Sequence, residues 1–239
     1  MRAESDKWKY LRNGFFRSLE PTVELVAITM PVGKYAKLCT PETLPGFTAR
    51  ESYQSQAKSS IKADKELNRR LIKRTHDTPL QAVQFDFKVI GISKALQAQW
   101  TRHKIGVGWT FRSTRYVSAS QNCFIYPTYD YLDDEAVVRE LLLIDEEIAR
   151  TAIQNFNRKR KLGASKEDAR RVMPVSFATR CYFYANARAM RHLFRLRLDK
   201  AAEWETRRMA KIMFDICMKW TPSLFKDMLS LRQTGRKEA

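Results

Sequence analysis

Residues 100–116, WTRHKIGVGWTFRSTRY, place cationic side chains among aromatic rings and glycines. The cations and the single histidine of this stretch are Arg102, His103, Lys104, Arg112 and Arg115. Guanidinium groups can bind phosphate oxygens in a fork geometry, and glycines let the backbone approach a ligand closely. Three interpretations therefore compete: a surface for nucleic acid, a solvated basic loop, or a pocket for a phosphorylated ligand that carries a ring.

Two further segments combine polar and apolar residues at helical spacing. Residues 185–207 read ANARAMRHLFRLRLDKAAEWETR, and on a helix Arg188 and His192 would lie one turn apart on the same face. Residues 168–174 place Arg170 and Arg171 shortly before Pro174, where a helix should stop. The alternative for residues 185–207 is an amphipathic helix whose polar face contacts only water.

The cysteines and histidines do not form a metal-ligand pattern. The cysteines are widely spaced and contain no CxxC pair, and each histidine lacks a second histidine or cysteine three or four residues away. These residues are Cys39, Cys123, Cys181, Cys217, His76, His103 and His192. We expect four reduced thiols and no metal site. His103, which lies between two cations, is expected to stay neutral.

The composition indicates a globular protein with an anionic partner. The 239 residues are 44% hydrophobic and 29% charged, with a net charge of +18 and a pI near 9.9. Charge alone favours nucleic acid, but it does not distinguish DNA, RNA and nucleotides. No apolar run reaches the roughly 18 residues of a membrane span, and the basic N-terminus has no apolar core, so we expect a cytoplasmic protein.

The elements that must position these residues begin with short strands. Residues 23–30 are apolar and β-branched, and Phe85, Phe87 and Val89 alternate with polar residues, so both segments are predicted to be strands. Residues 31–55 are rich in proline and glycine and predict a long loop. Residues 63–74 predict a polar helix that breaks at the Thr-His-Asp-Thr-Pro sequence of residues 75–79.

Helices dominate the second half of the chain. Residues 136–160 carry an apolar stripe and end in four cations before Gly163, an arrangement typical of a helix C-terminus. Ser165 is a predicted N-cap, residues 199–220 carry another stripe, and Thr221 with Pro222 predicts the start of a further helix. The stripe of the first helix comprises Val137, Leu141, Ile144, Ile148 and Ala152. We predict one helix-rich α+β domain that spans residues 1–239.

These segments, in this order, resemble the flavin-dependent thymidylate synthases. That family has a His-x-Thr-Pro turn, a Gln-Trp pair, an Arg-His-Arg motif and a serine followed by Arg-Tyr. In the same order, the matching segments of this chain are His76-Asp77-Thr78-Pro79, Gln99-Trp100, Arg102-His103-Lys104 and Ser113-Thr114-Arg115-Tyr116. The family continues with Ala-Arg before a proline, Asn-Ala-Arg, Leu-Arg and an Ala-Gln-x-Glu-x-Arg signature; the matching segments here are 169–174, 186–188, 196–197 and 202–207. The resemblance covers about residues 70–228 and fades over residues 1–60.

The resemblance implies a fold, a reaction and an assembly. It implies an α+β domain with a small antiparallel sheet, and a homotetramer that holds FAD at subunit interfaces. The implied reaction moves a one-carbon unit from methylenetetrahydrofolate to C5 of dUMP and gives dTMP, with NADPH as reductant. Because the flavin carries the difficult chemistry, no cysteine nucleophile is needed. A membrane is not implied, and nucleic acid becomes an unlikely partner.

The resemblance also assigns residues to the two ligands. It gives the nucleotide Gln99, Arg102, Ser113, Thr114, Arg115, Arg170 and Arg197. It gives FAD His76, Thr78, Arg102, His103, Lys104, Asn186, Arg188 and His192. Arg115 with Ser113 and Thr114 would hold the phosphate, Arg170 would lie beside the nucleotide, and Arg197 would read the uracil edge. Of these, Arg197, Arg170 and Ser113 are the residues implied to act in catalysis.

This chain departs from the family pattern around the nucleotide. The family has Asn-Glu shortly before its serine, whereas this chain has Thr110 and Phe111 and a loop one residue longer. Lys104 replaces an arginine, which keeps the charge but loses the planar fork. Glu203 replaces the signature glutamine, and Ala82 replaces a histidine. Three hypotheses stay open: thymidylate synthesis, the same chemistry on UMP or with a hydroxymethyl product, and a non-catalytic protein that binds nucleic acid.

Overall fold

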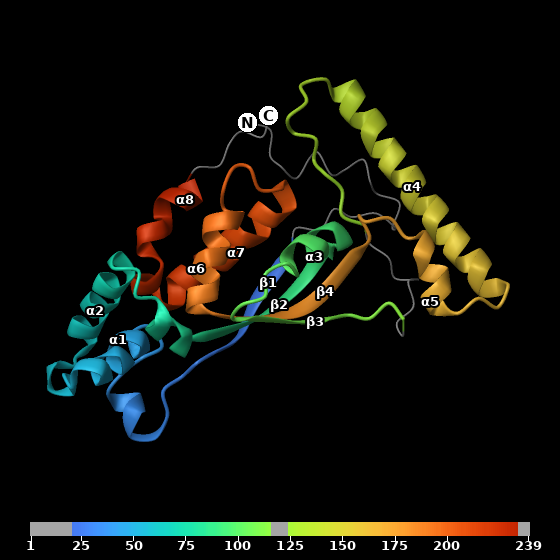
Figure 1. The fold of residues 1–239 in the computed structure, drawn as a ribbon. Coiled ribbons are helices and arrows are strands. Elements are labelled where there is room, and N and C mark those ends of the chain that lie inside the picture. The colour runs from blue at the N-terminus through green and yellow to red at the C-terminus, as the bar shows by residue number, and fades with distance from the viewer. Residues whose placement is uncertain (1–20, 116–123, 234–239) are drawn as a thin grey trace.

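A four-stranded antiparallel sheet forms the centre of the computed structural model, which describes residues 21–115 and 124–233. Its strands are β1 (Thr22–Ile28), β2 (Gln84–Ser93), β3 (Val107–Phe111) and β4 (Ala178–Asn186), in the order β1-β2-β4-β3. The predicted strands at residues 23–30 and around Phe85 are therefore confirmed. Together with the helices below, the sheet confirms the predicted α+β class (Figure 1).

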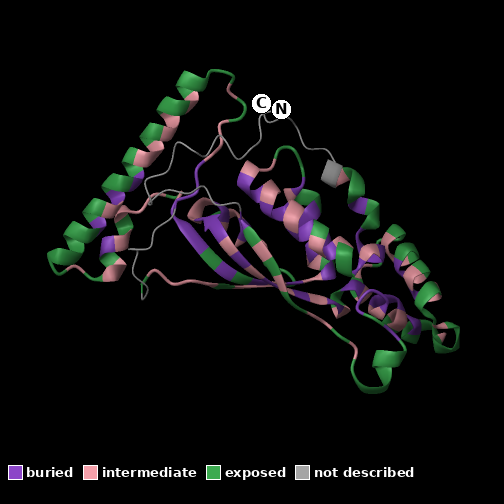
Figure 2. Cartoon of the chain, turned by 180° about the vertical axis from the view of Figure 1, so that it is seen from behind, coloured by how far each residue is buried: buried purple, intermediate pink, exposed green. Residues whose placement is uncertain are grey.

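Helices cover the apolar face of the sheet (Figures 1 and 2). The alternating residues Phe85, Phe87 and Val89 of β2 point into a core that they share with Phe183 of β4. The other wall of this core is made by α6 (Ala187–Arg197) and α7 (Trp204–Trp220), with α3 (Lys94–Trp100) beside them. Helix α7 starts at Trp204, since Glu203 accepts hydrogen bonds from the first backbone N–H groups.

Residues 31–55 are not the long loop that the prolines and glycines predicted. They form η2 (Gly33–Lys37), α1 (Leu44–Ala49) and η3 (Arg50–Tyr53), and η4 (Gln56–Lys58) and α2 (Ile61–Lys73) follow. A proline in the first turn of α1 suits helix initiation. The buried Arg50 guanidinium donates to the buried Asp64 carboxylate of α2 at 2.5 Å, so an ion pair between distant positions orders this segment.

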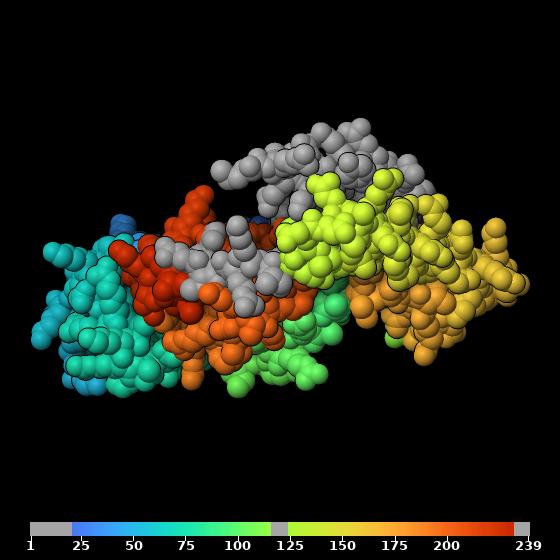
Figure 3. Space-filling view, turned by 90° about the horizontal axis from the view of Figure 1, so that it is seen from above, coloured from blue at the N-terminus to red at the C-terminus, as the bar shows by residue number. Residues whose placement is uncertain are grey.

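The longest helix, α4 (Glu135–Lys161), lies apart from the sheet (Figure 1). It ends as predicted: cations occupy its last turn and Gly163 adopts a φ of +89°. Ser165 caps α5 (Lys166–Ala169), also as predicted, by accepting from Asp168 N at 3.0 Å. Figure 3 shows α4 and α5 at one end of the molecule, with α1 and α2 at the other.

The apolar stripe of α4 is only partly covered by the chain itself. Ala152 is buried, and its neighbours Ala149 and Phe156 pack in a small core with Phe124. Val137, Ile144 and Ile148, in contrast, are 43%, 46% and 49% exposed. The helix prediction is confirmed, but much of the stripe faces outward.

Short helices complete the described chain. These are η5 (Thr78–Ala82), η7 (Arg170–Val172), η8 (Pro222–Leu224), η9 (Lys226–Met228) and α8 (Leu229–Gln233). Thr221 is the N-cap residue of η8 and Pro222 starts this helix, as predicted. The Thr221 side chain makes no capping hydrogen bond, because its hydroxyl donates back to Cys217 O at 3.1 Å. That one domain spans residues 1–239 stays a prediction.

The described cysteines Cys39, Cys181 and Cys217 are free and buried, while Cys123 lies outside the described residues. Among the residues that the structure describes, no helix has the length and apolar character needed to cross a membrane.

Candidate active site

The quoted stretch of residues 100–116 is not one loop. Trp100 ends α3, residues 101–106 turn, β3 follows, and Ser113–Arg115 leave the sheet, while Tyr116 lies outside the described residues. Trp100 belongs to the core, and Trp109 and Phe111 pack against it: the ring of Trp109 stacks on Phe183 at 4.1 Å and meets Trp100 edge-on at 5.8 Å. The rings therefore anchor the stretch, and the cations remain at its two ends.

Helix α3 comes directly before the turn of residues 101–106, and α7 holds its N-cap residue, Ser93. Ser93 caps α3 by accepting from Leu96 N at 2.9 Å. Ser93 N donates to Glu205 Oε1 of α7 at 2.7 Å, and the Ser93 hydroxyl donates to Glu205 Oε2 at 2.5 Å. Glu205 is only 2% exposed, and burial raises its pKa to about 7, against the lowering effect of these hydrogen bonds.

At the C-terminal end of α3, three predicted site residues meet. Arg197 of α6 donates from Nε to His103 Nε2 at 3.0 Å and from Nη2 to Gln99 O at 3.2 Å. Thr206 of α7 donates from Oγ1 to Gln99 Oε1 at 3.4 Å. Residues that lie about a hundred positions apart in the sequence thus form one polar cluster, which we call the Arg197 cluster: Gln99, His103, Arg197 and Thr206.

His103 is held neutral, as predicted, but by other groups than expected. Burial lowers its pKa to about 4, and the charge of Arg197 and the His192 ring add to this effect. The rings of His103 and His192 are 6.2 Å apart. The side chains of Arg102 and Lys104, which are next to His103 in the sequence, are exposed. The cation that lowers the pKa of His103 is therefore Arg197 of α6.

Three of the residues that the resemblance assigns to a cofactor, Asn186, Arg188 and His192, lie at the start or in the first half of α6. Asn186 ends β4 and caps α6 by accepting from Ala189 N at 2.9 Å. Arg188 and His192 then lie one turn apart and are both exposed, as predicted. Gly106, with a φ of +69°, packs against Asn186: its O accepts from Asn186 N at 3.0 Å, and an added Cβ would lie 2.5 Å from Asn186 Nδ2.

His76 and Thr78 reach the same region through η5. Thr78 starts η5, which contacts α6, and Ala187 N donates to Val83 O at 2.8 Å. The side chains of His76 and Thr78 are exposed. This arrangement brings the His-Asp-Thr-Pro turn to the start of α6, although the turn lies about a hundred residues earlier in the sequence.

At the other end of α3, the residues after β3 meet the segment after α5. Arg170 donates from Nη1 to Thr114 Oγ1 at 2.8 Å. Arg115 N donates to Ser113 Oγ at 3.3 Å, and Arg115 Nε lies 3.1 Å from Glu167 Oε2. We call Ser113, Thr114, Arg115 and Arg170 the Arg170 cluster. Arg170 influences the charge of Lys94, the first residue of α3, so this cluster lies near the start of the helix and the Arg197 cluster lies at its end.

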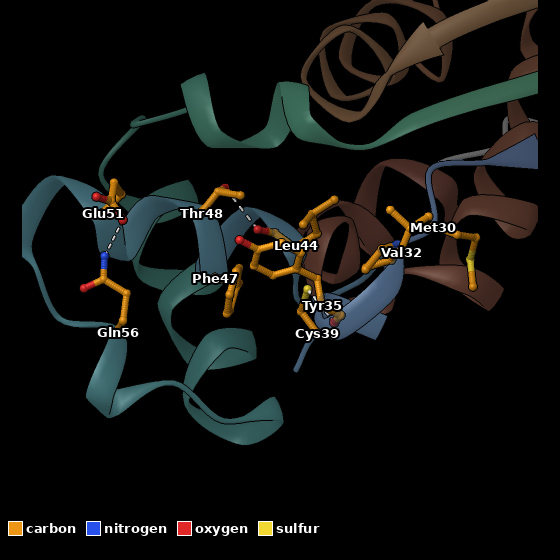
Figure 4. Close-up of a pocket in the computed structure, with 10 residues that line it drawn as sticks. Met30, Val32, Tyr35, Cys39, Leu44, Phe47, Thr48, Glu51 and Gln56 are labelled. Atoms are coloured by element: carbon orange, nitrogen blue, oxygen red, sulfur yellow. Dashed lines mark hydrogen bonds between the residues drawn. The ribbon is translucent and has the colours of Figure 1, made fainter. Parts of the chain in front are cut away.

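The cavity in Figure 4 lies elsewhere. It measures about 620 Å³ and is lined by Met30, Tyr35, Phe47 and neighbouring residues between the end of β1 and α1. None of its lining residues is a predicted site residue. The two clusters instead lie along α3.

Several neighbours in the site were missed by sequence reasoning. Lys94, Arg112 and Glu167 contact or influence the Arg170 cluster, and Glu205 and Thr206 hold α3. Arg112 lies inside the quoted stretch, and Glu205 and Thr206 lie inside the signature segment. The motifs could therefore have pointed to these three residues. No sequence pattern pointed to Lys94.

The fold and the two clusters define an α+β protein with cationic side chains at both ends of one short helix. The chain belongs to the family described as "Thymidylate synthase complementing protein", which matches residues 35–223. The "Flavin-dependent thymidylate synthase" of Clostridium tetani (strain Massachusetts / E88) is 33% identical over 181 residues, which are 70% of this chain and 71% of that protein. The protein of the same name from Kosmotoga olearia is 29% identical over 198 residues, 78% of this chain and 85% of its own length.

Proposed function

We propose that this protein is a flavin-dependent thymidylate synthase that methylates C5 of dUMP and gives dTMP. Methylenetetrahydrofolate would supply the carbon and NADPH the reducing equivalents. The observation that carries the proposal is the placement of the Arg197 cluster and the Arg170 cluster at opposite ends of α3. A nucleotide needs such a pair of sites, because its phosphate and its base lie at its two ends.

The Arg170 cluster suits the phosphate. Arg170 and Arg115 carry permanent charges, and Ser113 and Thr114 carry hydroxyl donors next to them. Arg115 pairs with Glu167, and both side chains are about half exposed, at 51% and 45%. An exposed ion pair contributes little stability, so Arg115 can exchange this partner for a phosphate at low cost.

The Arg197 cluster suits the base. The Arg197 guanidinium is positioned by two acceptors, His103 and the Gln99 carbonyl, before any ligand arrives. A positioned cation beside the ring would stabilise negative charge that develops on the base when C5 reacts. Arg102, exposed at the end of α3, would bind both nucleotide and flavin.

The residues around the start of α6 fit the flavin cofactor. FAD contains a pyrophosphate, and exposed cations and an amide are suitable donors for it. The residues that would hold FAD are His76, Thr78, Arg102, His103, Lys104, Asn186, Arg188 and His192. When bound, the flavin supplies the hydride and accepts reducing equivalents from NADPH.

The described cysteines support a route without a thiol nucleophile. Burial raises the pKa of Cys39, raises that of Cys181 to about 12 and raises that of Cys217 well above its ordinary value. A nucleophilic cysteine needs a lowered pKa and access to the substrate. Cys39, Cys181 and Cys217 have neither.

We also propose a homotetramer. Val137, Ile144 and Ile148 of α4 are each between 43% and 49% exposed, and apolar residues at helical spacing are usually covered. A second copy of the chain would cover this face. Light scattering on the purified protein tests the assembly: Ile144→Glu with Ile148→Glu should lower the mass of the particle, whereas Arg139→Glu, an exposed position on another face of the same helix, should not.

A second candidate keeps the flavin chemistry and changes the nucleotide or the product. At the position of the family's glutamate, Phe111 stacks on Trp109 at 5.4 Å, and Thr110 Oγ1 lies 3.2 Å from the phenol oxygen of Tyr184. The side chains at both positions are therefore uncharged, which changes the electrostatic environment of a nucleotide. UMP methylation or pyrimidine hydroxymethylation would follow from such a change.

One experiment separates these candidates. The protein is mixed with dUMP, UMP and dCMP together, plus FAD, NADPH and methylenetetrahydrofolate, and the nucleotides are weighed by mass spectrometry. A methyl gain on dUMP alone supports thymidylate synthesis. A gain on UMP or dCMP, or a hydroxymethyl mass, supports the second candidate. No gain on any nucleotide refutes both. A cytoplasmic location stays a prediction.

A further inference from the structure

Two cations that the resemblance assigns to no ligand lie beside the Arg170 cluster. Lys94 is the first residue of α3, and its backbone N donates to Phe177 O at 3.1 Å. Arg112 follows β3, and its Nη2 donates to Ala178 O at 3.3 Å. Because Phe177 and Ala178 are adjacent, the start of β4 brings Lys94 and Arg112 to the same place.

Arg170 is the third cation at this place. It donates to Thr114, two residues after Arg112. The Lys94 ammonium lies within the electric field of both guanidinium groups: burial lowers the pKa of Lys94, and the charges of Arg112 and Arg170 lower it further. All three side chains belong to half-buried residues.

The contacts of Lys94 and Arg170 hold both side chains in place without removing their charge. Lys94 Nζ donates to Gln97 Oε1 at 2.7 Å, and Arg170 Nη1 donates to the Thr114 hydroxyl at 2.8 Å. Both acceptors are neutral. Like charges that are half-buried together repel one another, and a bound anion with two negative charges relieves the repulsion.

We propose that Lys94 and Arg112, together with Arg170, bind the phosphate dianion of the substrate next to Ser113–Arg115. Both residues then determine specificity, because they favour a nucleoside monophosphate over the nucleoside. The identity of the nucleotide rests on the proposed function, but the binding of a phosphate group at this place does not.

The experiment measures the binding of inorganic phosphate to the full chain by calorimetry, without added nucleotide. Lys94→Gln and Arg112→Gln should each weaken phosphate binding about ten- to a hundredfold, as expected for one charged hydrogen-bond donor. Arg171→Gln is the matched control, because Arg171 is next to Arg170 but its side chain is 77% exposed and lies 4.0 Å from Asp168. Its phosphate affinity should be unchanged.

Folding is tested separately. Arg112 also holds the Ala178 carbonyl, so Arg112→Gln could unfold the chain, and the thermal midpoint of each variant is measured first. Lys94→Arg keeps the charge and should keep most of the phosphate affinity, which a loss of packing at this position would not allow. Unchanged phosphate affinity in folded Lys94→Gln, or an equal loss in Arg171→Gln, overturns the proposal.

Failure of this proposal is distinguishable from failure of the proposed function. If Lys94→Gln weakens phosphate binding but the wild type methylates no nucleotide, the anion site stands and the thymidylate synthase proposal fails. If the wild type methylates dUMP and Lys94→Gln binds phosphate normally, only the anion site fails. If both proposals are correct, Lys94→Gln should raise the KM for dUMP by about the factor by which it weakens phosphate binding, with little change in kcat.

Discussion

Arg197 donates from Nε to His103 Nε2 at 3.0 Å, and this contact joins α6 to the turn after α3. The contact requires His103 to be neutral at Nε2, so its proton is assigned to Nδ1 from the hydrogen-bond geometry. A protonated His103 could not accept this bond. The pKa of His103 and the position of Arg197 are therefore coupled.

The first prediction concerns the pKa of His103. In Arg197→Ala, the pKa should rise from about 4 toward the ordinary 6.5 but stop short of it, because burial is its largest cause and persists. NMR titration of the imidazole measures this shift. Arg195→Ala, an exposed change on the same helix, should leave the value where it is. A His103 pKa that does not move in Arg197→Ala would show that the two side chains do not interact in solution.

The second prediction concerns turnover. Arg197→Ala should lower kcat on dUMP about a hundredfold or more, since a positioned donor to developing charge is lost. Arg197→Lys keeps the charge but loses the planar fork, so its kcat should fall between those of Arg197→Ala and the wild type. Steady-state kinetics with saturating flavin measure both variants, with Arg195→Ala as control. Normal turnover in Arg197→Ala would remove Arg197 from the active site.

The third prediction compares two glycines that both adopt positive φ. At Gly163, with a φ of +89° and no atom within 4 Å of an added Cβ, alanine should cost only the backbone strain, about 1 kcal/mol. At Gly106, with a φ of +69°, alanine should cost a further 1–3 kcal/mol, roughly, because its Cβ would collide with Asn186.

Denaturant unfolding measures the stability of both variants, and titration with FAD measures their affinity for the flavin. Only Gly106→Ala should weaken flavin binding, because Asn186 starts the helix that carries Arg188 and His192. Equal losses of stability in the two variants would contradict the close packing of Gly106 on Asn186.

The fourth prediction concerns the pH dependence of stability. The pKa of Glu205 is about 7 in the folded protein, against 4.5 for an ordinary glutamate. Between these values the folded state binds more protons than the unfolded state, so stability should fall as the pH rises from about 4.5 to 7, by about 3 kcal/mol in total. Above pH 7 the loss from this group is complete.

Glu205→Gln removes this titration and should flatten the dependence over the same range. Unfolding by urea at several pH values measures it, and Glu66→Gln, an exposed change on α2, is the control. A slope in Glu205→Gln equal to that of the wild type would exclude Glu205 as its source.

Local patterns in the sequence determined most of the regular structure. The alternation around Phe85, the stripe and cationic end of residues 136–160 and the Ser165 cap each depend on neighbours within a few residues, and the structure has all three. The motifs, taken in order, also identified the family. Where the local signal was ambiguous, sequence reasoning failed: the prolines of residues 31–55 predicted a loop, but the ion pair of Arg50 with Asp64 orders helices there.

Only the tertiary structure decided which side chains meet. Gln99 and Arg197, Thr114 and Arg170, and Ser93 and Glu205 are each separated by more than fifty residues, and no periodicity encodes such pairs. The antiparallel pairing of β2, β3 and β4 sets where α3 and α6 begin, and the core beneath them sets their spacing. Sequence reasoning therefore named the candidate site residues, whereas their contacts, and the positions of Lys94 and Arg112 beside them, follow from packing between distant parts of the chain.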